Sequence, residues 1–150
     1  MAATAGTRLL PDTAKACVNR SGAALYTDRL VGYGTPDGSE DAVDSLHTPG
    51  LTKIAGAIQV AADDDDQVTV YGPGSIVELE SDGSATITYG ADVEAVAGSA
   101  ASDSGRVKSI TATTGTKYVV GKSRSKSTVA ATAGAKVLVE LCHPTRVYVP

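Results

Sequence analysis

The chain has 150 residues, enough for one domain to bury a core and too few for two ordinary domains. Its 42% hydrophobic residues are mainly Ala and Val, since Phe and Trp are absent, and together with 16 Gly and 6 Pro they favour short strands and turns over long helices. The formal net charge of −4 gives no global attraction to nucleic acid.

The first predicted element is an N-terminal arm, residues 1–14, and residues 15–150 are predicted to form a single β-rich domain. The arm is rich in Ala and Thr and holds one apolar pair, Leu9 and Leu10, directly after Arg8. We expect the domain to be mainly β, a compact antiparallel sandwich or barrel with at most one short helix. The reason is that short apolar runs alternate with turn signals along its whole length.

The start of the chain also bears on the redox state of the two cysteines. Residues 1–10 lack the apolar core of a secretory signal. We therefore expect Cys17 and Cys142 to be reduced in a protein that is made in the cytoplasm. No apolar run approaches the roughly 18 residues of a membrane span, so no membrane is expected as a partner.

Ten β-strands are predicted from apolar runs and from alternation. They are residues 54–60, 67–71, 76–80, 85–89, 93–97, 107–111, 118–121, 129–132, 137–141 and 147–149. The alternation is clear where Val68 and Val70 flank Thr69. A period of two places apolar side chains on one face of a strand and polar side chains on the other, which is typical of a half-buried antiparallel sheet.

Residues 39–47 are the best candidate for a helix. Ser39 would be the N-cap, two acids would follow in the first turn, and Pro49 would end the helix. Residues 91–101 are ambiguous, because Ala and Glu favour a helix whereas Gly98 and the serines after it disfavour one.

Three segments share a spacing in which an apolar residue, a turn-prone residue and a second apolar residue stand three positions apart. They are Leu25-x-x-Asp28-x-x-Val31, Ile87-x-x-Gly90-x-x-Val93 and Ala131-x-x-Gly134-x-x-Val137. The spacing predicts a tight turn that leads the chain into a strand, with the valine pointing inward. These segments are either ordinary turns before strands or a weak internal repeat.

The charged residues divide much of the chain into two stretches of opposite sign. Fourteen acids and one base lie between Asp37 and Asp103, whereas six bases and no acid lie between Arg106 and Lys126. Three interpretations stay open: two solvated faces, a head-to-tail contact between subunits that closes a ring, or DNA binding by the basic stretch. The head-to-tail interface would consist of Asp63, Asp64, Asp65, Asp66, Lys122, Arg124 and Lys126. DNA binding lacks interleaved aromatic residues and a helix that could enter a groove.

Two motifs resemble ligand sites but depart from them. Residues 121–123, Gly-Lys-Ser, could end a phosphate-binding loop, but the first glycine of that motif would fall at Thr116. The acids 63–66 could attract Ca²⁺, but an EF-hand loop that began at Asp63 would need Gly where Val68 stands. A solvated turn that blunts a sheet edge is the favoured interpretation of the four acids.

The remaining reactive side chains do not form a catalytic or metal-binding pattern. His47 and His143 have no second His or Cys at metal-ligand spacing, and Cys142 would point away from its neighbour His143 on a strand. Glu78 and Glu80 share a strand face, which fits an outward polar surface better than a carboxylate pair. The sequence predicts no enzyme, no catalytic residues, no cofactor and no metal.

Four short motifs in a fixed order carry a resemblance. They are Ala85-Thr-Ile87-Thr-Tyr-Gly90-Ala-Asp92-Val93, then Gly105-Arg106-Val107, then Tyr118-Val-Val-Gly121, and finally Ala133-Gly134-Ala-Lys-Val137-Leu-Val139. In this order they resemble the small capsid cement, or head decoration, proteins of tailed bacteriophages. The likeness covers about residues 74–141, with a fainter echo at residues 23–31. Some relatives are labelled recombinase-like, and the missing phosphate loop argues against that label here.

The resemblance implies a structural virion protein on the exterior of a phage capsid, made in the bacterial cytoplasm. It implies that the partners are the major capsid protein and further copies of the chain as a homotrimer, with no nucleic acid. The N-terminal extension through Gly34 and the acidic insertion at residues 37–66 depart from the shortest members, so contacts there are not carried over. We expect capsid contacts at Arg8, Leu9, Leu10, Arg146 and Tyr148.

Other classes of protein remain as alternatives. A phage tail or baseplate module, or another β structural or adhesion module, would have a similar composition. A ligand-binding barrel would need a pocket lined by bulky apolar and aromatic groups, which a chain without Phe or Trp builds with difficulty. An enzyme would need a converging set of catalytic side chains, and this is the weakest alternative.

Overall fold

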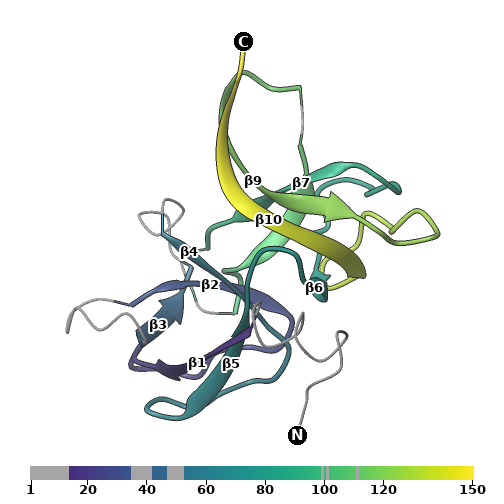
Figure 1. Ribbon diagram of the computed structural model, residues 1–150. Coiled ribbons are helices and arrows are strands. Elements are labelled where there is room, and N and C mark those ends of the chain that lie inside the picture. Colours follow the sequence, from purple (N-terminus) through teal and green to yellow (C-terminus); the bar gives the residue numbers. More distant parts are fainter. Residues whose placement is uncertain (1–13, 35–41, 47–52, 99, 101, 111) are drawn as a thin grey trace, which may run out of the picture.

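The computed structural model describes residues 14–34, 42–46, 53–98, 100, 102–110 and 112–150. In this part the protein is all-β, which confirms the predicted fold class (Figure 1). The strands are β1 (Ala14–Asn19), β2 (Arg29–Tyr33), β3 (Ala42–Ser45), β4 (Ile54–Ile58), β5 (Gln67–Tyr71), β6 (Ile76–Glu80), β7 (Asp92–Val96), β8 (Arg106–Ser109), β9 (Gly115–Ser123) and β10 (Lys136–Val149). The described residues contain no helix with the length and apolar character that crossing a membrane requires.

The first five strands close a small barrel in the order β1-β3-β2-β4-β5. β1 pairs with β3 in parallel and with β5 in antiparallel orientation, so it joins the two ends of the antiparallel row β3-β2-β4-β5. The barrel interior holds small and medium-sized apolar side chains, as the composition requires. They are Cys17, Leu25, Val31, Val43, Ile58, Ala62, Val68 and Val70.

The last five strands form an antiparallel sheet in the order β6-β10-β9-β7-β8. This sheet curls until its two ends meet. Ser81, just after β6, forms a parallel bridge with Val107 of β8, and the Asp82 N–H donates to the Val107 carbonyl at 3.0 Å.

A single apolar cluster joins the barrel to the sheet. Leu30, Leu46, Ile54 and Ala57 of the barrel belong to the same buried cluster as the inward side chains of the sheet. Those side chains are Val77, Leu79, Ile87, Val93, Ala95, Val107, Val120, Val129, Val137, Val139 and Leu141. β2 therefore contributes to both interiors, because Leu30 faces the sheet cluster while its neighbour Val31 faces the barrel interior.

The three spaced segments form the turns that the sequence predicts. Their middle residues all have positive φ: 56° at Asp28, 77° at Gly90 and 84° at Gly134. The valines three positions later are fully buried: Val31, Val93 and Val137. Glycine adopts this backbone region without steric cost, and Asp is among the few other residues that tolerate it.

The ambiguous segment 91–101 contains β7, which confirms the strand predicted at residues 93–97. Three other predictions about elements are wrong. The described part of the expected helix at residues 39–47 contains β3. β3 pairs with strands on both sides and buries Ala42 and Val43, so tertiary pairing outweighs the local helix preference. Segments 85–89 and 129–132 are not strands, since one bridge between Ile87 and Val129 joins them.

Three further strands differ from the prediction. β1 and β2 were not predicted, and the two strands predicted at residues 137–141 and 147–149 are parts of the single strand β10. A register shift between Leu141 and Thr145 lets β10 pass through Cys142, His143 and Pro144 without ending.

Candidate functional site

A two-stranded ribbon projects from the sheet at the C-terminal end of the chain (Figure 1). It consists of residues 115–119 of β9 and 145–149 of β10, with Thr145 opposite Val119 and Val149 opposite Gly115. The pairing of β7 with β9 stops at Val119, and β6 pairs with β10 only as far as Glu140. In the described part of the chain both outer edges of the ribbon are therefore without a strand partner.

The outer face of the ribbon carries two tyrosines and an arginine. Arg146 lies opposite Tyr118, and Tyr148 lies opposite Thr116 on the same face. The Tyr148 side chain is 65% exposed. No ion pair or hydrogen bond of the Arg146 side chain occurs among the described residues. Tyrosine and arginine are the residues most enriched at the energetic centres of protein interfaces.

On the inner face of the ribbon, the charge of Lys117 is neutralised by Glu94 of the sheet. Lys117 Nζ lies 3.9 Å from Oε1 of Glu94, and Lys108 Nζ lies 3.7 Å from the same oxygen. Glu94 is buried, so the two lysines supply the positive charge that its carboxylate needs. The basic character available to a partner therefore lies on the Arg146 face.

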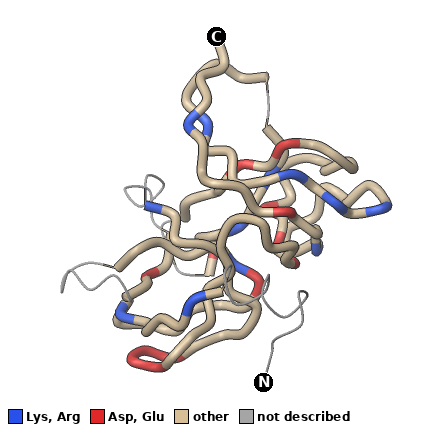
Figure 2. Tube along the Cα trace, in the orientation of Figure 1, with Lys and Arg blue, Asp and Glu red and all other residues tan. Residues whose placement is uncertain are grey.

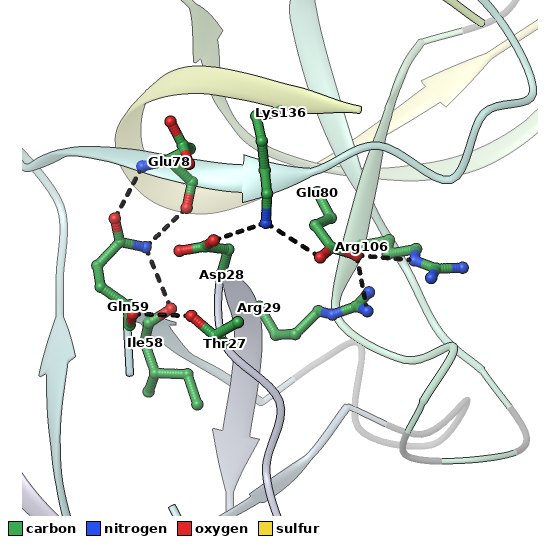
Figure 3. A network of polar contacts seen from close by, with 9 residues as sticks. All are labelled: Thr27, Asp28, Arg29, Ile58, Gln59, Glu78, Glu80, Arg106 and Lys136. Carbon is green, nitrogen blue, oxygen red and sulfur yellow. Dashed lines mark hydrogen bonds and ion pairs between the residues drawn. The ribbon is translucent and has the colours of Figure 1, made fainter. Parts of the chain in front are cut away.

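In the described part of the chain, contacts cover the other two edges of this sheet, at β6 and β8. The side-chain amide of Gln59 accepts a hydrogen bond from the Glu78 N–H at 3.0 Å and donates one to the Glu78 carbonyl at 2.6 Å. The Glu80 N–H donates to the Asp28 carbonyl at 3.1 Å. Figure 3 shows how Gln59 stands beside β6 as the peptide group of a neighbouring strand would. These contacts cover β6, and the bridge between Ser81 and Val107 covers β8.

The four acids 63–66 form a turn between β4 and β5, which Figure 2 shows as the red loop at the lower end of the barrel. Asn19 fixes this turn, because its side-chain amide donates to the carbonyls of Ala62 and Asp63 at 3.1 Å each. Asp65 adopts a φ of 67° and pairs with Arg20. We call residues 63–66 the acidic turn.

Two carboxylates of the acidic turn are engaged within the molecule and two are not. Asp64 accepts a hydrogen bond from the Gly22 N–H at 2.9 Å, and Asp65 forms an ion pair with Arg20. Asp63 and Asp66 are exposed and have no side-chain partner among the described residues. The turn therefore presents net negative charge to solvent.

Beside the acidic turn, the chain segments after β4 and before Tyr71 of β5 separate. β4 and β5 close the barrel through the pair Ala57 and Tyr71, and no backbone hydrogen bond joins residues 59–61 to residues 67–70 in the described part. A groove of about 280 Å³ lies between these segments and is lined by Gln59, Val60, Ala61, Gln67, Val68, Thr69 and Tyr71. We call it the wall groove.

The basic half of the predicted interface is largely paired within the molecule. Lys122 Nζ lies 2.5 Å from Asp92 Oδ1, and Arg124 forms a hydrogen bond and ion pair with Glu140 at 2.5 Å. The Arg124 guanidinium also lies 5.9 Å from the centre of the Tyr89 ring. The hydrogen bond to Glu140 raises the pKa of Arg124. Of the three predicted bases, Lys126 alone shows no ion pair in the described residues.

An ion network links the barrel to the sheet (Figure 3). Glu80 is its centre: Arg29 Nη2 lies 2.8 Å and Arg106 Nε 3.5 Å from one carboxylate oxygen, and Lys136 Nζ lies 3.0 Å from the other. Lys136 also contacts Asp28 at 2.7 Å. Arg29 is 6% exposed, and its Nε and Nη1 atoms have no hydrogen-bond partner in the described part.

The pKa shifts in this network follow from burial and charge. Burial lowers the pKa of Arg29, against the opposing effect of Glu80. Burial alone would raise the pKa of Glu80, but the hydrogen bond from Lys136 and the charges of Arg29, Lys136 and Arg106 lower it overall. Burial disfavours the charged form of Lys136, whereas hydrogen bonds to Asp28 and Glu80 raise its pKa. Glu80 is thus held as a carboxylate between three cations.

The residues considered for chemistry are separated or outside the described part. No group of three or more His, Cys, Asp or Glu side chains lies close enough to hold a metal ion among the described residues. Gly121, Lys122 and Ser123 are part of the extended strand β9. Neither Cys17 nor Cys142 forms a disulfide among the described residues, and burial, followed by the charge of Asp92, raises the pKa of the Cys142 thiol.

Of the predicted capsid contacts, Arg8, Leu9 and Leu10 lie outside the described residues. His47, which was considered as a metal ligand, also lies outside them. Arg146 and Tyr148 share the outer face of the ribbon, as their spacing of two on one strand indicates. The wall groove and the ribbon's open edges escaped the sequence analysis, because both depend on where pairing between strands stops.

Comparisons of the chain with family models, with curated proteins and with solved structures found no match.

Proposed function

We propose that this chain is a structural protein of a phage virion, a capsid cement or decoration protein that binds the outside of the head and stabilises it against internal pressure. Its partners are the major capsid protein and further copies of itself, assembled as a homotrimer. The proposal rests on the order of the four motifs between residues 85 and 139 and on the kind of surface that the fold presents.

One observation carries the proposal: in the described part of the chain, the C-terminal sheet leaves its ribbon uncovered, and this ribbon has an aromatic and cationic face. A two-stranded ribbon is at best marginally stable alone in water, and side chains such as Tyr118, Arg146 and Tyr148 are of the types enriched at the energetic centres of protein interfaces. A binding role between protein surfaces gives them a purpose. The capsid contacts predicted at Arg8, Leu9 and Leu10 are part of the same proposal.

The test is binding of the purified protein to isolated heads of its parent phage from which the native copies have been removed. We expect saturable binding with about one copy per major capsid subunit, measured by quantitative gel of pelleted heads, since a shell-wide lattice needs many copies. Heads with bound protein should also survive heating better than stripped heads.

The opposite results have clear meanings. No binding to stripped heads would defeat the proposal. Absence from heads together with a few copies in purified tails would replace it with a tail or baseplate role.

A further inference from the structure

We propose that the C-terminal ribbon of one copy docks into the wall groove of a second copy, with the acidic turn of the second copy receiving Arg146 of the first. The contact joins two different surfaces of the same chain, so it is heterologous. It does not depend on the proposed function, because it concerns the purified protein alone.

The wall groove is suited to receive a strand. Beyond Ala57 and Tyr71 the strands β4 and β5 separate, which leaves backbone groups of residues 59–61 and 67–70 without each other as partners. The rim is polar at Gln67 and Thr69, and Val60 beside it is 72% exposed. Extended peptides bind at such open strand edges through main-chain hydrogen bonds, and side-chain pockets add specificity.

The C-terminal ribbon has the open strand edges that binding in the wall groove requires. Both of its edges lack a strand partner in the described part of the chain, whereas Gln59 and Asp28 cover the edge of the same sheet at β6. Natural proteins cover or blunt exposed edges, so an open edge next to exposed Tyr148 and Val147 indicates a pairing surface.

Opposite charges on the ribbon and beside the wall groove favour a second copy of this chain as the occupant of the groove. Arg146 is the cation of the ribbon's outer face without an ion pair among the described residues, and no acid lies on residues 115–119 or 145–149. Asp63 and Asp66 stand beside the wall groove with no side-chain partner in the described part. A ribbon against a second ribbon would bring like charges together, whereas the ribbon against the acidic turn brings opposite charges together.

The two surfaces lie at opposite ends of the molecule, so one copy cannot satisfy both. Figure 2 shows the acidic turn as the red loop at the lower end and the C-terminal ribbon at the upper end. Each copy therefore offers one ribbon and one groove, and repeated contacts close into a ring or extend as a chain. The proposed contact keeps the acids of the interface predicted from sequence. It uses Arg146 in place of Lys122 and Arg124, because Asp92 and Glu140 already neutralise those two bases. The proposed contact assigns Arg146 and Tyr148 to the neighbouring copy in place of the capsid contact predicted for them. The capsid contact of the proposed function then falls to Arg8, Leu9 and Leu10.

Two complementary variants test the proposal by sedimentation velocity. The ribbon variant carries Arg146→Glu and Tyr148→Ser, and the groove variant carries Asp63→Ser and Asp66→Ser; all four side chains are exposed, so each variant should fold. We expect wild type to associate, less so at high salt because exposed charges are screened, and each variant alone to associate about tenfold more weakly or to be monomeric. An equimolar mixture should form a one-to-one complex, since one intact ribbon then meets one intact groove.

The matched control is Lys126→Glu with Tyr89→Ser, which changes the same chemistry outside the ribbon. Tyr89 is 63% exposed, close to the value for Tyr148, and this variant should associate as wild type does. Monomeric wild type at low salt would overturn the proposal. Self-association of the groove variant as strong as that of wild type, or a mixture that stays monomeric, would overturn it as well. A chain that associates but fails to bind stripped heads would defeat the proposed function and leave this contact standing.

Discussion

Gly90 and Gly105 have the same backbone conformation, but they differ in the space around their Cα atoms. Their φ angles are 77° and 76°, a region that favours glycine. Around Gly90 an added Cβ would meet nothing within 4 Å, whereas at Gly105 it would lie 2.2 Å from the Leu30 carbonyl oxygen. The Gly105 carbonyl also accepts a hydrogen bond from the Leu30 N–H at 2.8 Å. Gly105 thus lets the sheet approach the barrel backbone, while Gly90 only turns the chain.

The pair predicts different costs for one substitution. Gly90→Ala should lower the free energy of unfolding by about 1 kcal/mol through backbone strain alone. Gly105→Ala should cost at least about 2 kcal/mol more, because the barrel and sheet backbones must also move apart. Urea unfolding followed by circular dichroism measures both values. Equal losses would mean that the Gly105 contact is not tight.

At the scale of elements, a side chain takes the place of a strand. Gln59 presents one donor and one acceptor to the backbone of Glu78, which is the pattern a neighbouring peptide group would offer. The Thr27 hydroxyl donates to the Gln59 carbonyl at 2.8 Å and helps to hold this segment beside β6. The barrel therefore protects an edge of the sheet without adding a strand to it.

Replacing this amide should expose the edge. Gln59→Leu keeps the size of the side chain but removes both hydrogen bonds, at a cost of about 1 kcal/mol. In hydrogen exchange measured by NMR, the Glu78 amide should exchange faster, while the Glu80 amide, bonded to the Asp28 carbonyl, should keep its protection. Gln67→Leu, a matched change on β5, should leave the Glu78 amide unaffected. Unchanged exchange at Glu78 in Gln59→Leu would show that the Gln59 contact does not protect this edge.

At the scale of the whole molecule, the barrel and the sheet are joined by apolar packing and by buried charge. The shared cluster gives most of the attraction, since it removes apolar area from water on both sides. The ion network adds specificity, but it also makes stability sensitive to Glu80. The buried positive charge of Arg29 is balanced by the Glu80 carboxylate. Removing one member of such a network leaves an uncompensated buried charge.

This network predicts a pH dependence of stability. Neighbouring cations lower the pKa of Glu80 in the folded state below its ordinary value of 4.5, so the carboxylate stabilises the fold fully above that pH. The stabilisation is lost as pH falls through the lowered pKa. Glu80→Gln should cost about 2–4 kcal/mol at neutral pH and make the acid-induced loss of stability shallower. Thermal unfolding of wild type, Glu80→Gln and the exposed control Glu78→Gln across this range measures the effect. Parallel curves for all three would contradict it.

The sequence by itself determined the features that depend on near neighbours. Alternation placed β5 at residues 67–71 and β6 at residues 76–80. The spaced segments predicted tight turns around Asp28, Gly90 and Gly134, and the structure forms these turns with positive φ. Composition also determined the all-β class, because many glycines and β-branched residues suit short strands and turns.

Only the tertiary structure decided what depends on distant pairing. It turned residues 42–45 into a strand because strands on both sides bind them, and it brought Asp28 to Lys136, 108 positions away in sequence. It also decided where pairing stops, which creates the wall groove and the open ribbon. Local propensity fixes how a segment prefers to fold, whereas the register between remote strands follows from packing of the whole chain, which no short pattern contains.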